Sequence, residues 1–231
     1  MTNFNIKVVS DAICPWCYVG KKRLERAIEL YKRDVPGGAN DTFNISWHPF
    51  YLDPTLPKGG VDVNVHLAEK YGPQRAAMIN SHLTAVGEAE GIKFSQQRKV
   101  GNTRDAHRLV QLAKTKSADA QDRLVSTLFR SHFEEGADIT SQGVLVAVAE
   151  KAGLDKNEAQ DWLDQGKGGE EVDKEVGEAY QKGIHGVPNF TINDRYELNG
   201  AQDPQKFLEV FAQAKKTSPD VSVESSKGPS C

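Results

Sequence analysis

The chain has 231 residues, 38% of them hydrophobic, which suffices for one large domain or for one domain that carries an insertion. A net charge of -3 without dense Lys/Arg blocks predicts neither a nucleic-acid partner nor a membrane partner. The N-terminus has no basic flank before a long apolar run, and no stretch approaches the roughly 18 apolar residues of a spanning helix. These features predict a cytoplasmic protein, with a clipped, exported mature form as the alternative.

Residues 4–10 alternate and are rich in β-branched side chains, which predicts a strand, and residues 43–48 repeat the pattern. Between them, apolar residues recur at helical spacing from Pro15 until Pro36-Gly37-Gly38 ends the helix. A β-α-β unit is therefore complete by residue 48.

The next hundred or so residues are predicted to be helical, with no convincing strand among them. Thr103, Thr140 and Ser141 stand where helix caps are expected. The predicted helices cover residues 62–71, 73–90, 103–116, 119–134, 141–152 and 157–165.

A further helix is predicted over residues 169–182. Strands at 189–193 and 196–198 follow, joined by Asp194-Arg195 as a hairpin, and a last helix starts at Asp203-Pro204.

The order of these elements predicts an α/β protein with a thioredoxin fold and an all-helical insertion. Residues 1–55 and 168–216 would form the discontinuous thioredoxin-like domain, and residues 56–167 the insertion. After residue 216 the chain has little to bury, which predicts a disordered tail over 217–231.

Two of the three cysteines form the run Cys14-Pro15-Trp16-Cys17. At a strand-to-helix junction, the free N–H groups of the first helical turn favour a thiolate, so Cys14 is the predicted nucleophile. Cys17 lies one turn further along and is the predicted resolving thiol. Pro15 suits the first helical position, and Trp16 would contact a thiol partner or shield the sulfurs.

A zinc site needs about four Cys or His ligands, and no second pair follows, so no metal is predicted.

Gly186-Val187-Pro188 stands immediately before a predicted strand. The residues alone favour a trans bond, whereas in a thioredoxin fold this proline would be cis and would face the cysteines. A cis Pro188 would let the Val187 backbone pair with an extended substrate as an added strand does.

Several other residues have a structural and a functional interpretation. His107 is more simply a packed histidine than a cleft residue, and Asp11 is either a local cap or a proton carrier. His185 either stabilises a thiolate or is merely exposed. Residues 47–50 are most simply a strand end with core aromatics, or else one wall of a groove. Cys231 is predicted to be an unpaired tail thiol, with a shuttle role as the alternative.

The runs at residues 10–20, 102–109 and 186–190 resemble the DsbA family of thioredoxin-fold proteins. Residues 133–139 and 198–202 are similar to its FrnE-like branch, so the resemblance covers residues 5–212. It implies a redox-active Cys14/Cys17 pair, a cis Val187-Pro188 bond and a helical insertion that roofs the active site.

This branch is similar to kappa-class glutathione transferases and 2-hydroxychromene-2-carboxylate isomerase, which have a serine where this chain has Cys14. The cysteine favours redox chemistry. If glutathione binds as a co-substrate, the resemblance implies backbone pairing at Val187, with Gln202 and Asp203 at its γ-glutamyl end and Asn102 on the facing wall.

The leading hypothesis is a thiol-disulfide oxidoreductase that needs no resident cofactor and acts on protein or small-molecule disulfides, as a monomer or a homodimer. The alternative is a glutathione-dependent isomerase or transferase acting on an aromatic or polyketide-like metabolite.

Overall fold

In the computed structural model, which describes residues 1–217, a four-stranded sheet has the order β2-β1-β5-β6. The central strand β1 (Asn3–Ser10) pairs in parallel with β2 (Thr42–Pro49) through the crossover helix α1 (Pro15–Asp34). On its other side β1 pairs antiparallel with β5 (Asn189–Ile192), which pairs with β6 (Tyr196–Asn199). Residues far apart in the chain therefore meet at the end of β1, where the cysteines follow.

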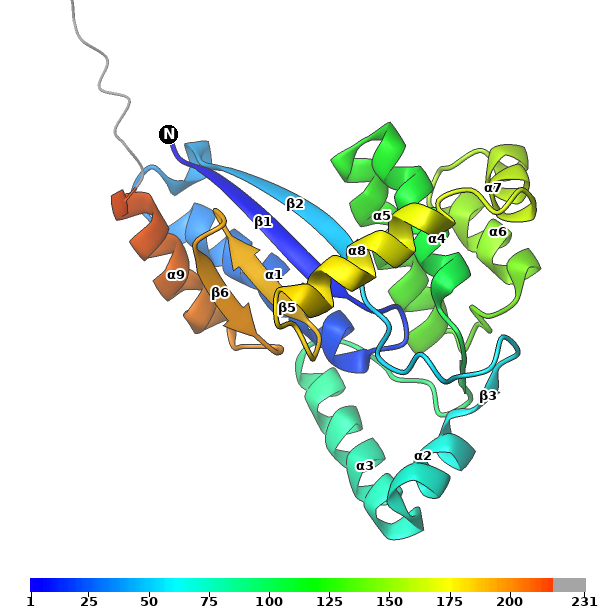
Figure 1. Cartoon of the computed structure of the whole chain (residues 1–231). Coiled ribbons are helices and arrows are strands. Elements are labelled where there is room, and N and C mark those ends of the chain that lie inside the picture. Colours follow the sequence, from blue (N-terminus) through cyan, green and yellow to red (C-terminus); the bar gives the residue numbers. More distant parts are fainter. Residues whose placement is uncertain (218–231) are drawn as a thin grey trace, which may run out of the picture.

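One face of the sheet packs against α1 and α9 (Pro204–Thr217) (Figure 1). Alternate residues of β1, Phe4, Ile6 and Val8, are completely buried on this face. Phe4 packs against Phe43 and Phe211, with ring centroids 4.7 and 5.2 Å apart. Burial of each such side chain contributes about 1.5–3 kcal/mol to the free energy of unfolding. This is why apolar residues occupy every second position along β1.

Helix α8 (Gly169–Gln181) covers part of the opposite face and leads back to β5 (Figure 1). A smaller apolar cluster of Val9, Phe50 and Ala179 forms there. Helices thus cover one face of the sheet and part of the other, where Asn3, Asn5 and Lys7 of β1 stay exposed. Together these parts form the predicted thioredoxin fold.

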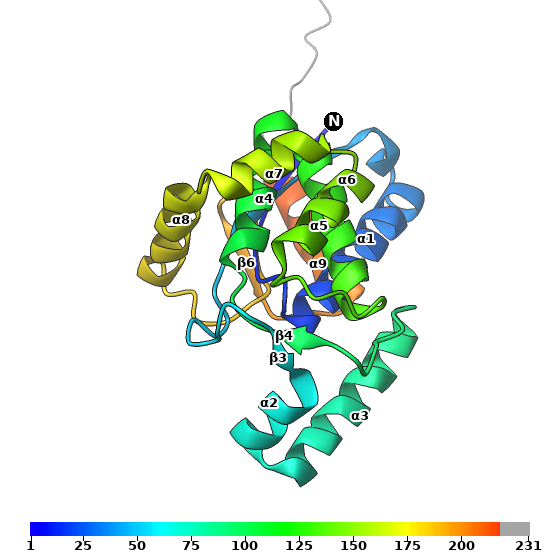
Figure 2. The ribbon, with the colours of Figure 1, turned by 90° about the vertical axis from the view of Figure 1, so that its right-hand side faces the viewer.

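The remaining helices lie at the end of the sheet to which the cysteines belong (Figures 1 and 2). Four of them pack together: α4 (Arg104–Lys116), α5 (Ala118–Phe133), α6 (Gln142–Lys151) and α7 (Lys156–Asp164). The other two, α2 (Val63–Tyr71) and α3 (Pro73–Ala89), project as a separate pair (Figure 2). Among the helices of residues 1–217, none is both long and apolar enough to cross a membrane.

Polar contacts of buried or half-buried side chains bind α1 to the inserted helices. The ammonium group of Lys21, only 2% exposed, lies 2.7 Å from Asp122 of α5. The Tyr18 hydroxyl donates to Glu134 at 2.5 Å, just beyond the end of α5. Arg23 pairs with Glu90, after α3, at 2.6 Å. The helix that carries the cysteines is therefore fixed to the insertion through its N-terminal part, over residues 18–23.

The predicted helices agree with the structure to within about one residue at each end, but the insertion is not entirely helical. Two short strands, β3 (Val61–Asp62) and β4 (Lys99–Val100), form an antiparallel pair. Two residues are too few to show a strand period. Thr103 occupies the N-cap position of α4, but its side chain makes no capping hydrogen bond; Asn102 Oδ1 accepts the Arg104 N–H at 3.0 Å instead.

The hairpin and the tail differ slightly from the prediction. Asn193 belongs to the turn rather than to β5, and both Asn193 and Asp194 have positive φ, of 51° and 53°. Asn and Asp tolerate this left-handed conformation, which a tight hairpin requires. Thr217 belongs to α9 rather than to a tail, and the rest of the predicted disordered tail, with Cys231, lies outside the described residues.

Candidate active site

Cys14 and Cys17 lie at the start of α1. Cys14 occupies the N-cap position with an extended backbone, Pro15 is the first helical residue, and the Cys17 N–H donates to the Cys14 carbonyl at 3.0 Å. Both thiols are free and almost completely buried. The Cys14 side chain therefore lies at the N-terminal, positive end of the helix dipole.

The loop before β5 completes the site from the other end of the chain. The Val187-Pro188 peptide bond is cis. The Cys14 thiol donates to the Val187 carbonyl oxygen at 3.6 Å. The pairing of β1 with β5 brings these two segments together, so the sheet register fixes the position of the loop relative to the sulfur.

Gly20 allows this loop to approach α1 closely. A Cβ at position 20 would lie 3.0 Å from Pro188 Cγ and 3.0 Å from Phe190 Cζ, tighter than ordinary van der Waals contact. The backbone of α1 and the proline ring are thus in direct contact one turn after Cys17.

We expect Gly20→Ala to lower the free energy of unfolding by about 1–3 kcal/mol and to slow reaction at Cys14, because the extra methyl group displaces the proline loop. The matched control is Gly177→Ala in α8, where no atom lies within 4 Å of an added Cβ. Urea denaturation and the rate with a model disulfide measure the two effects. Equal stability of the two variants would contradict this account.

Cys17 is held as a neutral thiol. Burial raises its pKa well above the ordinary value, and the neighbouring Cys14 thiol raises it further. The Asp11 backbone and the Ser10 side chain act in the opposite direction, because their hydrogen bonds lower the pKa. Cys17 must therefore lose its proton in a buried environment before it attacks.

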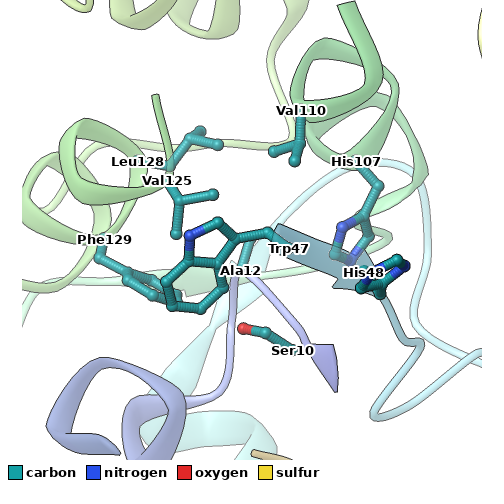
Figure 3. Close-up of a pocket in the computed structure, with 9 residues that line it drawn as sticks. All are labelled: Ser10, Ala12, Trp47, His48, His107, Val110, Val125, Leu128 and Phe129. Atoms are coloured by element: carbon teal, nitrogen blue, oxygen red, sulfur yellow. The ribbon is translucent and has the colours of Figure 1, made fainter. Parts of the chain in front are cut away.

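A small cavity of about 20 Å³, room for roughly one water molecule, lies beside Ser10 at the end of β1 (Figure 3). Ser10 and the rings of His48 and His107 provide its polar lining, and Trp47 with other apolar side chains forms the rest. The full lining consists of Ser10, Ala12, Trp47, His48, His107, Val110, Val125, Leu128 and Phe129.

Ser10→Ala should raise the pKa of Cys17 further, because it removes a hydrogen bond that favours the thiolate. We expect the release of a thiol from a mixed disulfide on Cys14 to slow about 3- to 10-fold near neutral pH, with its pH profile moved upward. Stopped-flow absorbance follows this release. Ser81→Ala, an exposed position on α3, is the control, and identical profiles for both variants would refute the role of Ser10.

Asp11 and His107 form a buried network beneath the active-site turn. Asp11 Oδ2 accepts the Leu52 N–H at 2.7 Å, and Oδ1 lies 3.4 Å from both the Ile13 nitrogen and His107 Nε2. His107 Nε2 also lies 3.1 Å from the Phe50 carbonyl oxygen. These contacts fit a local cap and a packed histidine, and they fix the loop after β2 against the turn.

The structure also places the other aromatic and histidine residues singled out in the sequence. Trp16 is 37% exposed, with its ring 5.8 Å from that of His82 on α3. His185 is exposed, and its ring lies 6.4 Å from that of Tyr180. Trp47 is buried, so it serves the core and the small cavity rather than an open groove.

Two of the three predicted glutathione residues, Gln202 and Asp203, are adjacent, while Asn102 lies far from them in the chain, and each has a partner within the protein. Gln202 donates to the Asn199 carbonyl at 2.6 Å, and Asp203 lies 3.3 Å from Arg23. Asn102 caps α4. Within residues 1–217, no hydrogen bond or ion pair connects Asn102 with Gln202 or Asp203.

A larger pocket of about 290 Å³, here called the α2–α3 pocket, opens beside the cysteines. Ile13 and Pro15, on either side of Cys14, form part of its wall, and α2 and α3 contribute mainly apolar side chains. Arg98, just before β4, is also in the wall. The lining comprises Ile13, Pro15, Leu52, Asp53, Leu56, Val63, His66, Leu67, Lys70, Tyr71, Ile79, Asn80, Leu83, Arg98 and Val100.

No group of three His, Cys, Asp or Glu side chains in the part of the chain that the structure describes is arranged to hold a metal ion.

Comparisons with known proteins agree with this geometry. The DSBA-like thioredoxin domain family model matches residues 5–212. The chain belongs to this family. Its structure is similar to a probable DsbA oxidoreductase, SCO1869 of Streptomyces coelicolor, with a TM-score of 0.83 and 31% identity over 93% of this chain and 91% of that one.

Two more distant solved structures share the fold. A 2-hydroxychromene-2-carboxylate isomerase has a TM-score of 0.65 at 16% identity, over 92% of this chain and 95% of that one. The cytosolic disulfide reductase DsbM of Pseudomonas aeruginosa has a TM-score of 0.60 at 17% identity, over 92% and 98%. At these identities the two structures support the thioredoxin-like fold with its helical insertion.

Proposed function

We propose that the protein is a thiol-disulfide oxidoreductase in which Cys14 attacks and Cys17 resolves, on protein or small-molecule, glutathione-type disulfides. One observation carries the proposal: the Cys14 sulfur lies at the N-terminus of α1, 3.6 Å from the Val187 carbonyl oxygen, while the buried Cys17 follows one helical turn later. This arrangement favours a thiolate at the first sulfur and a protected thiol at the second.

In the proposed cycle, the Cys14 thiolate attacks one sulfur of the substrate disulfide, and the other leaves as a thiolate that takes up a proton. Cys17 then loses its proton, and its thiolate attacks Cys14 Sγ to release the second substrate thiol. The substrate gains two electrons, and the protein is left with a Cys14–Cys17 disulfide. A dithiol reductant restores the protein by the same exchange in reverse.

Substrate binding is assigned to Pro15, Trp16, Val187 and Pro188. Val187 presents its backbone to an extended segment, and Trp16 provides a partly exposed apolar surface beside the sulfurs. Where glutathione is the co-substrate, Gln202, Asp203 and Asn102 are the proposed contacts. We place this activity in the cytoplasm, as for the cytosolic reductase DsbM.

The test is the turnover of glutathione disulfide and of insulin disulfides with a dithiol reductant. Cys14→Ser should abolish both activities, while Cys231→Ser should retain them. Full activity of Cys14→Ser would exclude the proposal.

The mainly apolar wall of the α2–α3 pocket extends to Pro15, next to Cys14. This favours a second candidate function, a glutathione-dependent isomerase or transferase acting on an aromatic or polyketide-like metabolite. This chemistry needs one sulfur or bound glutathione only. A Cys17→Ala variant should then keep isomerase turnover, and loss of that turnover would argue against the second candidate.

A further inference from the structure

Among the residues that the structure describes, Arg98 is a buried cation without an anionic partner. Its side chain is 5% exposed, and its Nε donates to the Ser95 carbonyl at 2.7 Å. The guanidinium carbon lies 5.6 Å from the centre of the Phe94 ring and 5.3 Å from that of Phe133. Within residues 1–217, its two terminal nitrogens donate to no protein atom and no carboxylate pairs with it.

Other buried cations of this protein are fully engaged. Arg108 is 3% exposed, and its guanidinium donates to Asp105 and to the carbonyl groups of Lys167, Trp162 and Leu163. Burial of a charge is costly unless partners compensate for the lost water. Arg98 departs from this pattern, and burial lowers its pKa to about 10, which leaves it charged at neutral pH.

Arg98, whose charge has no carboxylate partner within residues 1–217, is one of the residues that line the α2–α3 pocket, together with Ile13 and Pro15 beside Cys14. Most of the remaining lining is apolar, so a ligand there would lose water around both its apolar body and any charge that it carries. In such a setting one charge-assisted contact at a fixed point orients the ligand strongly.

The charges of the pocket favour one negative charge on the ligand. Besides Arg98, Asp53 and Lys70 line the pocket, and these two pair with each other at 2.9 Å. The remaining unbalanced charge is one positive guanidinium. Its planar fork matches the two oxygens of a carboxylate, and one negative charge on the ligand would balance it.

We propose that the α2–α3 pocket binds a small molecule with an apolar body and one carboxylate, and that Arg98 receives this carboxylate. The inference that this pocket is the substrate site of the reductase rests on the proposed function. In that case the carboxylate would contact Arg98, and the opposite end of the ligand would lie beside Cys14. Arg98 would be a specificity residue that favours carboxylate-bearing disulfides over neutral ones.

Binding can be tested without any redox step. Calorimetry with naphthoate and with the neutral naphthamide should show that the wild-type protein prefers naphthoate. In Arg98→Met the Kd for naphthoate should rise about 10- to 100-fold, while the Kd for naphthamide stays within about twofold. Lys93→Met, which removes an exposed positive charge outside the pocket, should behave as wild type. Equal binding of the acid and the amide by the wild-type protein would overturn the proposal, whether or not Arg98→Met folds.

Turnover distinguishes this proposal from the proposed function. Wild type and Lys93→Met should reduce dithiobis(nitrobenzoate), an aromatic disulfide with carboxylates, with a lower KM than neutral dithiodipyridine. Arg98→Met should lose this preference, and its reaction with dithiodipyridine shows whether the dithiol is intact. Arg98→Lys should retain part of the preference. If the wild-type protein reduces neither disulfide, the proposed oxidoreductase activity is refuted. If Arg98→Met keeps the wild-type preference, only the role of Arg98 is refuted.

Discussion

Replacing Cys17 with alanine is expected to stop disulfide reduction at a covalent intermediate in which Cys14 carries half of the substrate. The attack by Cys14 needs only the first sulfur, which lies at the start of α1 beside the Val187 carbonyl. Release of the second half needs the neighbouring thiol of Cys17, which is buried and held neutral. Turnover with a dithiol reductant should fall by a factor on the order of 10³, because resolution must then come from solution.

Intact-protein mass spectrometry detects this intermediate directly. In a Cys231→Ser background, Cys17→Ala should gain the mass of one substrate thiol, whereas Cys14→Ser should gain none. A Cys17→Ala variant that shows no adduct and reduces disulfides at the wild-type rate would contradict the two-cysteine cycle. Retention of an isomerase activity by this variant would instead support the glutathione-dependent alternative.

Acidification from neutral pH is expected to destabilise the fold through His132. This side chain is completely buried on α5, and its Nε2 has no hydrogen-bond partner among residues 1–217. Burial, with a smaller contribution from the nearby Arg98, lowers its pKa to about 4. Because the unfolded chain takes up a proton near the ordinary value of 6.5, the stability from neutral His132 is complete above that pH. It is lost as pH falls toward 4, for a total of about 3 kcal/mol.

Urea denaturation near neutral pH and near pH 4.5 measures this loss. His132→Gln should lose less stability between the two conditions than wild type, even if it is less stable at neutral pH. His185→Gln, which changes an exposed histidine, should keep the wild-type dependence. A His132→Gln variant with the same pH dependence as wild type would show that other groups cause the acid sensitivity.

Much of the fold is predictable from this sequence because its elements are long and periodic. The alternation in β1 places Phe4, Ile6 and Val8 on one face, and those side chains are all buried. The short pair β3 and β4 was missed because each strand has two residues and depends on the other for its hydrogen bonds. Local pattern carries no information about such a contact.

The part of the candidate site that lies in one short stretch of the chain, residues 14–17, can be predicted from the sequence. The spacing of Cys14 and Cys17 and their place before a helix are enough to predict two thiols with different roles. Arg98 is different, since it lies in a polar run and nothing nearby marks it as buried. Its burial comes from distant contacts, including the Ser95 N–H bond to the Phe133 carbonyl at 2.7 Å and the Val63 N–H bond to its own carbonyl at 3.0 Å. Ser10 likewise acquires a role only through the fold, which brings its side chain within hydrogen-bonding distance of Cys17.

The polar contacts between α1 and the insertion limit how the protein can be shortened. A minimal scaffold made by joining residue 55 directly to residue 168 would leave Lys21 without Asp122, Tyr18 without Glu134 and Arg23 without Glu90. It would also uncover the indole of Trp47, which packs against Phe129. For protein engineering, α1 and the insertion should therefore be kept together. Substitutions within the wall of the α2–α3 pocket are then the way to change the proposed specificity.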